Sequence, residues 1–482
     1  MKKIYILSLI LISFACQKEN EINMKPVAAF SNNKDIIEEG QTISFNCLSF
    51  DKDGEISKRL WDFGNGSNSE EKDPTITFEN AGTFTIKLTV WDNIGQQNPI
   101  EFVKEVTVKE KSLADVQPEI LWEYQTPAGF QDIAPALDSK GNIIIGCDAK
   151  VGRPGGSDNI LVINNGSLVW KYTSGDVVRS SAAISDNDII YIGSYDKKLY
   201  AFNTFTNTPL GSFNLGANAK FSSPAIDSDG TVYYSGNKKL FAISPAPEMN
   251  QLWAFDCEGV TQSTPVIDNN TVYIASNSGY LYAVNKDGSL KWKIQFGTTC
   301  SSVPAIGKDG SIYLCAENSE GGLVISISPE GNINWKIQSG AKFLNSGIVI
   351  DNNNQLYVGH SNGELLCLNT NDGQTVWSFK SQGKIISTPA IDNLNNVCFG
   401  DDKGVFYVLN KEGKMRYKEL KLGSKIWSSP AIGPDGTIYI CSDITTSSEP
   451  GKLYALRTIA MQPLDSWSMR SGNAKRNSRI DK

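Results

Sequence analysis

The chain has 482 residues, a length that suggests two or more domains. Its net charge of −7 and the lack of any Lys/Arg run argue against a nucleic-acid partner. With a single histidine, the sequence has few routes to histidine metal sites or to Ser-His and Cys-His nucleophile pairs. That residue, His360, lies in a Gly-His-Ser-Asn-Gly turn, and we expect it to be a surface or turn-stabilising residue rather than a ligand.

The N-terminus has the pattern of an export signal. Lys2 and Lys3 precede the apolar run Ile4–Phe14, which is followed by Ala15 and Cys16. The run is shorter than the ~20 residues of a membrane span but suits a signal-peptide core. The segment resembles a lipoprotein signal peptide, which implies that Cys16 is lipidated. Ordinary cleavage and a retained anchor are the alternatives.

The other eight cysteines are far apart, and no CxxC pair occurs. Several, such as Cys47, Cys367 and Cys398, fall inside apparent strands. We expect small buried apolar side chains rather than disulfides, a zinc site or a redox site.

Residues 25–109 contain alternating runs typical of half-buried antiparallel strands, including Thr42–Cys47 and Thr83–Val90. Between them lie an Asp-Lys-Asp-Gly turn at Asp51–Gly54 and the sequence Trp-Asp-Phe-Gly-Asn-Gly at Trp61–Gly66. With Asn80–Phe84, these motifs resemble a PKD domain, which implies a small β-sandwich that acts as a spacer or as a contact unit for protein or glycan.

The Trp61–Gly66 motif makes physical sense as a strand followed by a turn. Trp61 and Phe63 point to one face of the strand, and Gly64 and Gly66 permit a tight turn. The resembled family usually has Asp where this chain has Asn65.

Asp51 and Asp53 alternate in the preceding turn. Oxygen ligands at alternate positions suit calcium, but two such carboxylates more often stabilise the turn. No third or fourth ligand is evident, so we predict no metal site.

A repeat of about 42 residues fills residues 119–458. An aromatic residue recurs eight times at spacings of 39–48 residues: Trp122, Trp170, Phe213, Trp253, Trp292, Trp335, Trp377 and Tyr417. A small-residue strand of the type Ser-Ser-Pro-Ala-Ile-Asp recurs eight times at similar spacings, with its proline position at Pro135, Ala182, Pro224, Pro265, Pro304, Ile348, Pro389 and Pro430. Each period contains four short strands, as in residues 222–256. The repeat therefore predicts an eight-bladed β-propeller of four-stranded blades, and an all-β protein.

Leu368–Trp377 resembles the tryptophan-docking motif of PQQ-like propellers, in which the Trp of one outer strand packs on the next blade. The proline-bearing strand is then innermost. Because Ile120–Tyr124 precedes any inner strand, we expect it to complete the last blade beside Lys452–Leu456. The tail Trp467–Asn473 resembles a terminal motif of PQQ-like lipoproteins.

The predicted organisation is a signal peptide, a tether, a PKD-like sandwich, a linker, a propeller and a tail, at residues 1–15, 16–24, 25–109, 110–118, 119–458 and 459–482.

A cation precedes several inner strands: Arg179, Lys220, Lys342, Lys384 and Lys425. Loops that enter the inner strand crowd around the channel mouth, so these groups could form a basic funnel for an acidic partner. Three insertions should rise on the same face: Cys147–Asn159, Cys315–Gly322 and Cys441–Gly451. The alternative is that the cations are only solvated and do not converge.

PQQ-like propellers include quinoprotein dehydrogenases and non-catalytic BamB-like scaffolds. Carboxylates at Asp132, Asp256 and Glu258 lie in ordinary turns. We therefore predict no enzyme, no cofactor and no catalytic residue, but a scaffold lipoprotein of the outer membrane, facing the periplasm or the cell surface, with a protein partner. Surface glycan or polymer binding is one alternative, and the three insertions contain no aromatic residue that would favour it. A PQQ-dependent dehydrogenase is the other.

Overall fold

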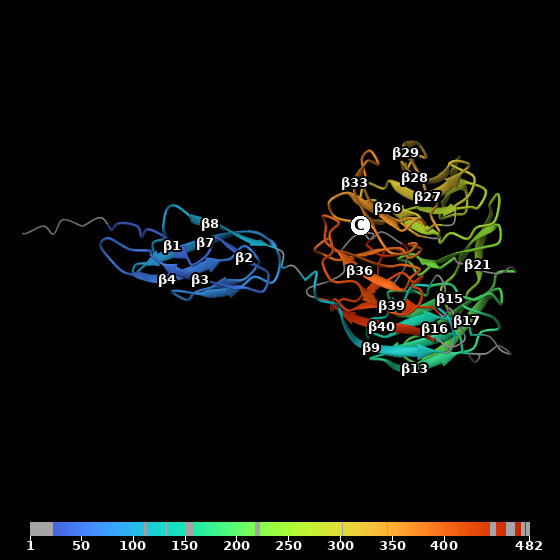
Figure 1. Ribbon diagram of the computed structural model, residues 1–482, viewed down its shortest axis with the longest axis horizontal. Helices are drawn as coiled ribbons and strands as arrows, with labels where there is room; N and C mark the ends of the chain where they lie inside the picture. The colour runs from blue at the N-terminus through green and yellow to red at the C-terminus, as the bar shows by residue number, and fades with distance from the viewer. Residues whose placement is uncertain are drawn as a thin grey trace, which may run out of the picture. The chain divides into compact units, whose positions relative to one another are not determined.

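The computed structural model describes residues 23–109, 111, 113–126, 128–130, 133–149, 158–216, 222–300, 302–344, 346–443, 450–458, 468–473 and 478. The chain divides into two compact units, Met1–Lys111 and Ser112–Lys482 (Figure 1). Strands and turns make up the described residues, and none of these forms a helix long and apolar enough to cross a membrane.

The first unit is a β-sandwich. One sheet has the order β1 (Phe30–Asn32), β3 (Thr42–Cys47), β6 (Thr75–Thr77). The other has the order β2 (Ile36–Glu38), β8 (Phe102–Lys109), β7 (Gly82–Asp92), β4 (Ile56–Asp62), β5 (Asn68–Ser69).

The core of the sandwich confirms the interpretation of the Trp61–Gly66 motif. Trp61 and Phe63 are buried, and their rings stack with centroids 6.4 Å apart. Gly64 and Gly66 have φ of 71° and 85°, in the left-handed region that favours glycine. The shared face was predictable because alternate residues of a strand point the same way, and the turn was predictable because glycine tolerates positive φ.

The second unit is an eight-bladed propeller of four-stranded antiparallel sheets, as predicted (Figure 1). The strands of each blade are given from the innermost outward. The first blade contains β10 (Ala136–Leu137), β11 (Ile143–Gly146), β12 (Ile160–Asn164) and β13 (Ser167–Tyr172), and the second contains β14 (Ala183–Ile184), β15 (Ile189–Gly193), β16 (Lys198–Asn203) and β17 (Thr208–Asn214). The third contains β18 (Ala225–Ile226), β19 (Val232–Gly236), β20 (Lys239–Ile243) and β21 (Gln251–Asp256), and the fourth contains β22 (Val266–Asp268), β23 (Thr271–Ala275), β24 (Tyr280–Asn285) and β25 (Leu290–Gln295). The fifth blade contains β26 (Ala305–Ile306), β27 (Ile312–Asn318), β28 (Gly321–Ile327) and β29 (Ile333–Ser339), and the sixth contains β30 (Val349–Ile350), β31 (Gln355–Gly359), β32 (Glu364–Asn369) and β33 (Thr375–Lys380). The seventh contains β34 (Ala390–Ile391), β35 (Val397–Gly400), β36 (Val405–Leu409) and β37 (Leu420–Lys421). The eighth contains β38 (Ala431–Ile432), β39 (Ile438–Ser442), β40 (Gly451–Arg457) and β9 (Glu119–Thr126).

The ring closes through its first strand. β9 is the outermost strand of the eighth blade and pairs antiparallel with β40, with Leu453 opposite Tyr124 and Ala455 opposite Trp122. The predicted closure is confirmed. It joins residues more than 300 positions apart and leaves no open seam between the first and last blades.

Tryptophan docking joins neighbouring blades. Four indole N–H groups donate to a carbonyl in the turn of the next blade: Trp253 to Lys286 at 2.7 Å, Trp292 to Pro329 at 2.9 Å, Trp335 to Thr370 at 2.7 Å and Trp377 to Lys411 at 2.9 Å. Each ring also lies on a glycine of that turn, where a Cβ atom would stand 2.6–2.9 Å from the ring: Gly288, Gly331, Gly373 and Gly413. This arrangement confirms the docking motif.

Two of the eight predicted docking aromatics are not at docking positions. In the second blade the residue in docking register is Gly211, opposite Ala201, and Phe213 lies two residues further on. Phe213 packs edge-to-face on Phe241 of the third blade instead. Tyr417 is buried but lies outside the short strand β37. Spacing alone did not separate these positions, because residues two apart in a strand face the same way.

A belt of hydroxyl groups joins innermost strands around part of the channel. At the position before the proline site, five of the eight blades have Ser or Thr, whose side chain accepts the backbone N–H of the same position in the preceding blade; Ala134, Val303 and Gly347 interrupt the belt. The donor–acceptor pairs are Ala134–Ser181, Ser181–Ser223, Ser223–Thr264, Gly347–Thr388 and Thr388–Ser429, at 2.8–3.1 Å. This belt is the physical reason for the Ser-Ser-Pro pattern.

The eight cysteines of the described residues are buried and free, as expected.

Candidate functional site

The predicted loops gather on one face of the propeller, at one mouth of the channel. We call this the loop face. It consists of two sets of segments: those that precede each innermost strand, and those that connect the second and third strands of each blade. Backbone bonds join the two sets: Ser361 N–H donates to Lys342 O at 2.9 Å, and Asp402 N–H donates to Lys384 O at 2.9 Å. We call the opposite mouth, formed by the turns after the innermost strands, the turn face.

The three predicted insertions differ from one another. Residues 150–157 of the first and 444–449 of the third lie outside the described residues. The second, Cys315–Gly322, is not a free loop: β27 and β28 continue as a ladder until Asn318 pairs with Gly321. This insertion joins the second and third strands, as predicted, and it is an extension of the hairpin.

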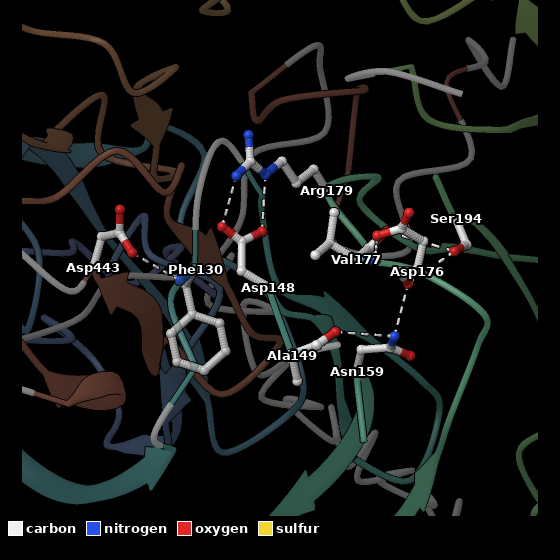
Figure 2. Close-up of polar contacts among 9 residues, drawn as sticks. All are labelled: Phe130, Asp148, Ala149, Asn159, Asp176, Val177, Arg179, Ser194 and Asp443. Carbon is white, nitrogen blue, oxygen red and sulfur yellow. Dashed lines mark hydrogen bonds and ion pairs between the residues drawn. The ribbon is translucent and has the colours of Figure 1, made fainter. Parts of the chain in front are cut away.

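Arg179 is held by a carboxylate at the loop face (Figure 2). Its Nε and Nη2 donate to the two oxygens of Asp148, each at 2.8 Å, in a bidentate pair. The side chains are 26% and 18% exposed, and the guanidinium lies 5.7 Å from the ring centroid of Tyr195. Burial acts to lower the pKa of Arg179, but the hydrogen bonds and charge of Asp148 outweigh it and raise the pKa. The pair fixes the guanidinium in place and neutralises it.

The surrounding backbone is held by side-chain amides and hydroxyls (Figure 2). The Asn159 amide donates to the carbonyls of Ala149 and Asp176 at 3.2 and 2.7 Å, and the Ser194 hydroxyl donates to Asp176 O at 3.0 Å. On the other side, Phe130 N–H donates to Asp443 at 3.0 Å and joins the first blade to the eighth. The first, second and eighth blades therefore present a rigid rim.

Lys342 also has an acidic neighbour. Its ammonium lies 3.1 Å from Glu317 of the fifth blade, with side chains 61% and 19% exposed. The charge is thus partly compensated, but most of the lysine remains in water, where such a pair contributes little.

Lys384 and Lys425 are different. Within the described part of the chain neither ammonium forms an ion pair. Lys425 lies 4.4 Å above the ring centroid of Trp427, and Trp427 and Ile386 are half-buried at equivalent positions of adjacent blades. The seventh and eighth blades therefore present two cations beside one aromatic and one aliphatic side chain.

Two predicted site residues, Cys16 and Lys220, lie outside the described residues, as does Asp132. The other two carboxylates considered, Asp256 and Glu258, form ion pairs with Lys239 at 2.6 Å and Lys293 at 2.6 Å. They do not face each other as an acid–base pair would.

His360 is buried in its turn. We expected a surface or turn-stabilising residue, and the surface position is wrong. It is 3% exposed and packs on Phe343, with ring centroids 4.4 Å apart. Burial lowers the pKa of His360 to about 4. The side chain fills space beneath the loop face as a neutral ring.

In the sandwich, Asp53 accepts the backbone N–H of Met24 at 2.9 Å, and burial raises the pKa of Asp51. In the part of the chain that the structure describes, no three Asp, Glu, His or Cys side chains are grouped to hold a metal ion.

Sequence reasoning missed Asp148, Glu317 and Trp427. Trp427 had a signal, because it directly precedes a Ser-Ser-Pro motif, at the position that Arg179 holds in the second blade. Asp148 and Glu317 had no such signal, because the cation that each one pairs with, Arg179 or Lys342, belongs to the next blade.

The docking tryptophans, the hydroxyl belt and the closure by β9 define a PQQ-like repeat propeller, here preceded by a PKD domain. Residues 157–299, 246–320 and 320–466 match the family model described as outer membrane protein assembly factor BamB, and residues 23–108 match a PKD domain. Since the first model covers more than half of the chain, the protein belongs to the BamB family.

The chain is similar to several known proteins over parts of its length. BamB of Salmonella typhimurium is 26% identical over 174 residues, which are 34% of this chain and 36% of that protein. The pre-pro-metalloprotease PrtV of Vibrio cholerae is 40% identical over 76 residues, 16% of this chain and 8% of that protein. The structure of BamB from Moraxella catarrhalis has a TM-score of 0.56 at 16% identity and covers 70% of this chain and 99% of that one.

A europium-containing methanol dehydrogenase has the same fold, with a TM-score of 0.55 at 13% identity, and covers 72% of this chain and 96% of that one. At this identity the likeness shows the shared fold alone.

Proposed function

We propose that the protein is a non-catalytic scaffold of the cell envelope that binds a protein partner through the loop face. Its PKD domain would serve as a spacer from the outer membrane, and Cys16 as the point of lipid attachment.

The observation that supports this proposal most is the difference between two pairs of cations on the loop face. Arg179 and Lys342 are compensated by Asp148 and Glu317, whereas Lys384 and Lys425 are not. An unpaired cation beside a half-buried tryptophan is the composition of an interface anchor, where an aromatic supplies buried area and a lysine steers an acidic partner. We therefore assign the proposed partner-binding surface to the seventh and eighth blades, which contain Lys384 and Lys425.

A protein partner suits this surface better than a glycan. Sugar-binding faces stack rings on exposed aromatics, but the Trp427 face is already covered by the Lys425 ammonium at 4.4 Å. Glycan binding remains the second candidate for the PKD domain and is separable by testing that domain alone.

The test is a charge reversal with a matched control. The double variant Lys384→Glu/Lys425→Glu should weaken capture of an envelope partner at least tenfold. The control Lys140→Glu/Lys308→Glu makes the same charge change at two exposed lysines of the turn face and should leave capture unchanged. Equal capture by all three proteins would remove the loop face from the proposal.

A further inference from the structure

Residues 468–472 and 478 are buried within the propeller. Ser468 and Ser478 are fully buried and Met469 is 1% exposed. Met469 belongs to the same hydrophobic cluster as Ile432 and Leu137, which lie on the innermost strands of the eighth and first blades. Residues 468–473 and 478 therefore pack against the inner wall of the propeller, and we call them the C-terminal segment.

The segment accepts backbone donors that innermost strands direct at the channel. Ile391 N–H of β34 donates to Ser468 O at 2.9 Å, and Ile267 N–H of β22 donates to Ser478 O at 2.9 Å. The channel-facing edge of an innermost strand has no neighbouring strand, so these N–H groups lack a partner in the sheet. The segment satisfies them as a short strand addition would.

The segment also crosses the channel. Ile432 N–H of the eighth blade is 3.2 Å from Met469 Sδ, whereas Ile267 belongs to the fourth blade. Blades four and eight are opposite each other in an eight-bladed ring. Two internal bonds hold the crossing chain: Gly472 N–H donates to Met469 O at 2.9 Å, and Ser478 N–H donates to Ser471 O at 3.0 Å.

The segment itself carries one basic residue, Arg470, which is 4% exposed. Five innermost strands are followed by a buried aspartate on the turn face: Asp138, Asp227, Asp268, Asp351 and Asp392. Asp227 is paired with Lys286 at 2.5 Å, and burial raises the pKa of Asp392 to about 7. The segment is thus held by backbone hydrogen bonds and by the burial of Met469.

We propose that the turn-face end of the channel is a binding site for an extended peptide, and that the C-terminal segment occupies this site in cis. The site is separate from the loop face and does not depend on the function proposed for that face. A tail of another protein could enter only by displacing the segment.

The first experiment uses a chain ending at residue 466 and a synthetic peptide of residues 467–482. The shortened chain should melt at a lower temperature, and the peptide should bind saturably and restore the melting temperature. The variant peptide Met469→Asp should fail, because it buries a carboxylate against Ile432. The matched control Ser471→Ala should bind like the parent, because the buried Ser471 hydroxyl makes no hydrogen bond among the described residues. An unchanged melting temperature without peptide binding would overturn the proposal.

A second experiment covers the case in which the shortened chain does not fold. A protease site inserted after Thr458 allows the folded full chain to be cut. The proposal predicts that the released fragment stays with the propeller during gel filtration and is displaced by an excess of the peptide, but not by the Met469→Asp peptide. Immediate loss of the fragment would show that it has no site of its own.

Discussion

Replacement of one docking glycine tests how much the contact between blades stabilises the propeller. Gly413 has φ of +76°, and a Cβ atom there would lie 2.6 Å from Cδ2 and Cε3 of Trp377. Gly413→Ala must therefore displace the indole, which also loses its 2.9 Å bond to Lys411 O. Gly141 is the matched control, because it has the same φ of +76° and nothing within 4 Å of the added Cβ.

The expected magnitudes follow from these two geometries. Both alanine variants suffer the left-handed backbone penalty of about 1 kcal/mol. Gly413→Ala additionally forces apart a packed contact, at about 1–3 kcal/mol, and loses a hydrogen bond of about 1 kcal/mol. We expect it to destabilise the propeller by about 2–4 kcal/mol more than Gly141→Ala does.

The assay is guanidinium unfolding followed by tryptophan fluorescence and near-ultraviolet circular dichroism. Gly413→Ala should lower the unfolding midpoint well below that of Gly141→Ala and alter the near-ultraviolet signal of the folded state. Equal midpoints would refute the reasoning, because the penalty would then arise from the backbone alone.

Three further predictions concern the closure, the histidine and the hydroxyl belt. Removal of residues 1–111 should leave the melting temperature of the propeller unchanged. Removal of residues 1–126 should lower it sharply, because the edge of β40 is then exposed. Equal melting temperatures of the two proteins would contradict closure by β9. The His360 pKa of about 4 lies below its ordinary value, so the unfolded chain takes up the proton first, and stability should fall by up to about 3 kcal/mol as the pH drops from 6.5 to 4. His360→Gln should lack this component in urea titrations across that range, and parallel pH profiles would count against it. Ser223→Ala leaves the buried Ser181 N–H without its 3.0 Å acceptor and should lower the free energy of unfolding by about 1–3 kcal/mol. The control Ser228→Ala changes an exposed serine and should alter the free energy of unfolding by less than about 0.5 kcal/mol. Similar losses in the two variants would contradict a stabilising role of the hydroxyl belt.

The architecture was predictable because each blade repeats the same local signals. Asp-Gly turns, period-two strands and the Ser-Ser-Pro inner strand set four strands per repeat, and the lack of an inner strand before Trp122 predicted the closure. The strand positions that dock on the next blade were harder to predict. Phe213 and Gly211 lie two residues apart on one face of the strand, so the recurrence of an aromatic residue did not distinguish them.

The site was predictable only in part. Position in the repeat indicated which cations share a face, but their charge state depends on residues of other loops, such as Asp148 for Arg179. The course of the C-terminal segment had no local signal either. Its partners are backbone N–H groups of three blades, which a sequence pattern does not reveal.

The most direct test of the central claim, a scaffold rather than a quinoprotein, is one titration followed by one capture experiment on the same purified protein. The protein is titrated with PQQ and calcium by calorimetry and then immobilised as bait for an envelope extract, beside its Lys384→Glu/Lys425→Glu variant. The account predicts no quinone binding, with a discrete protein that is retained by the parent, released by salt and lost from the variant. Saturable, calcium-dependent quinone binding, with no protein that distinguishes the parent from the variant, would contradict it.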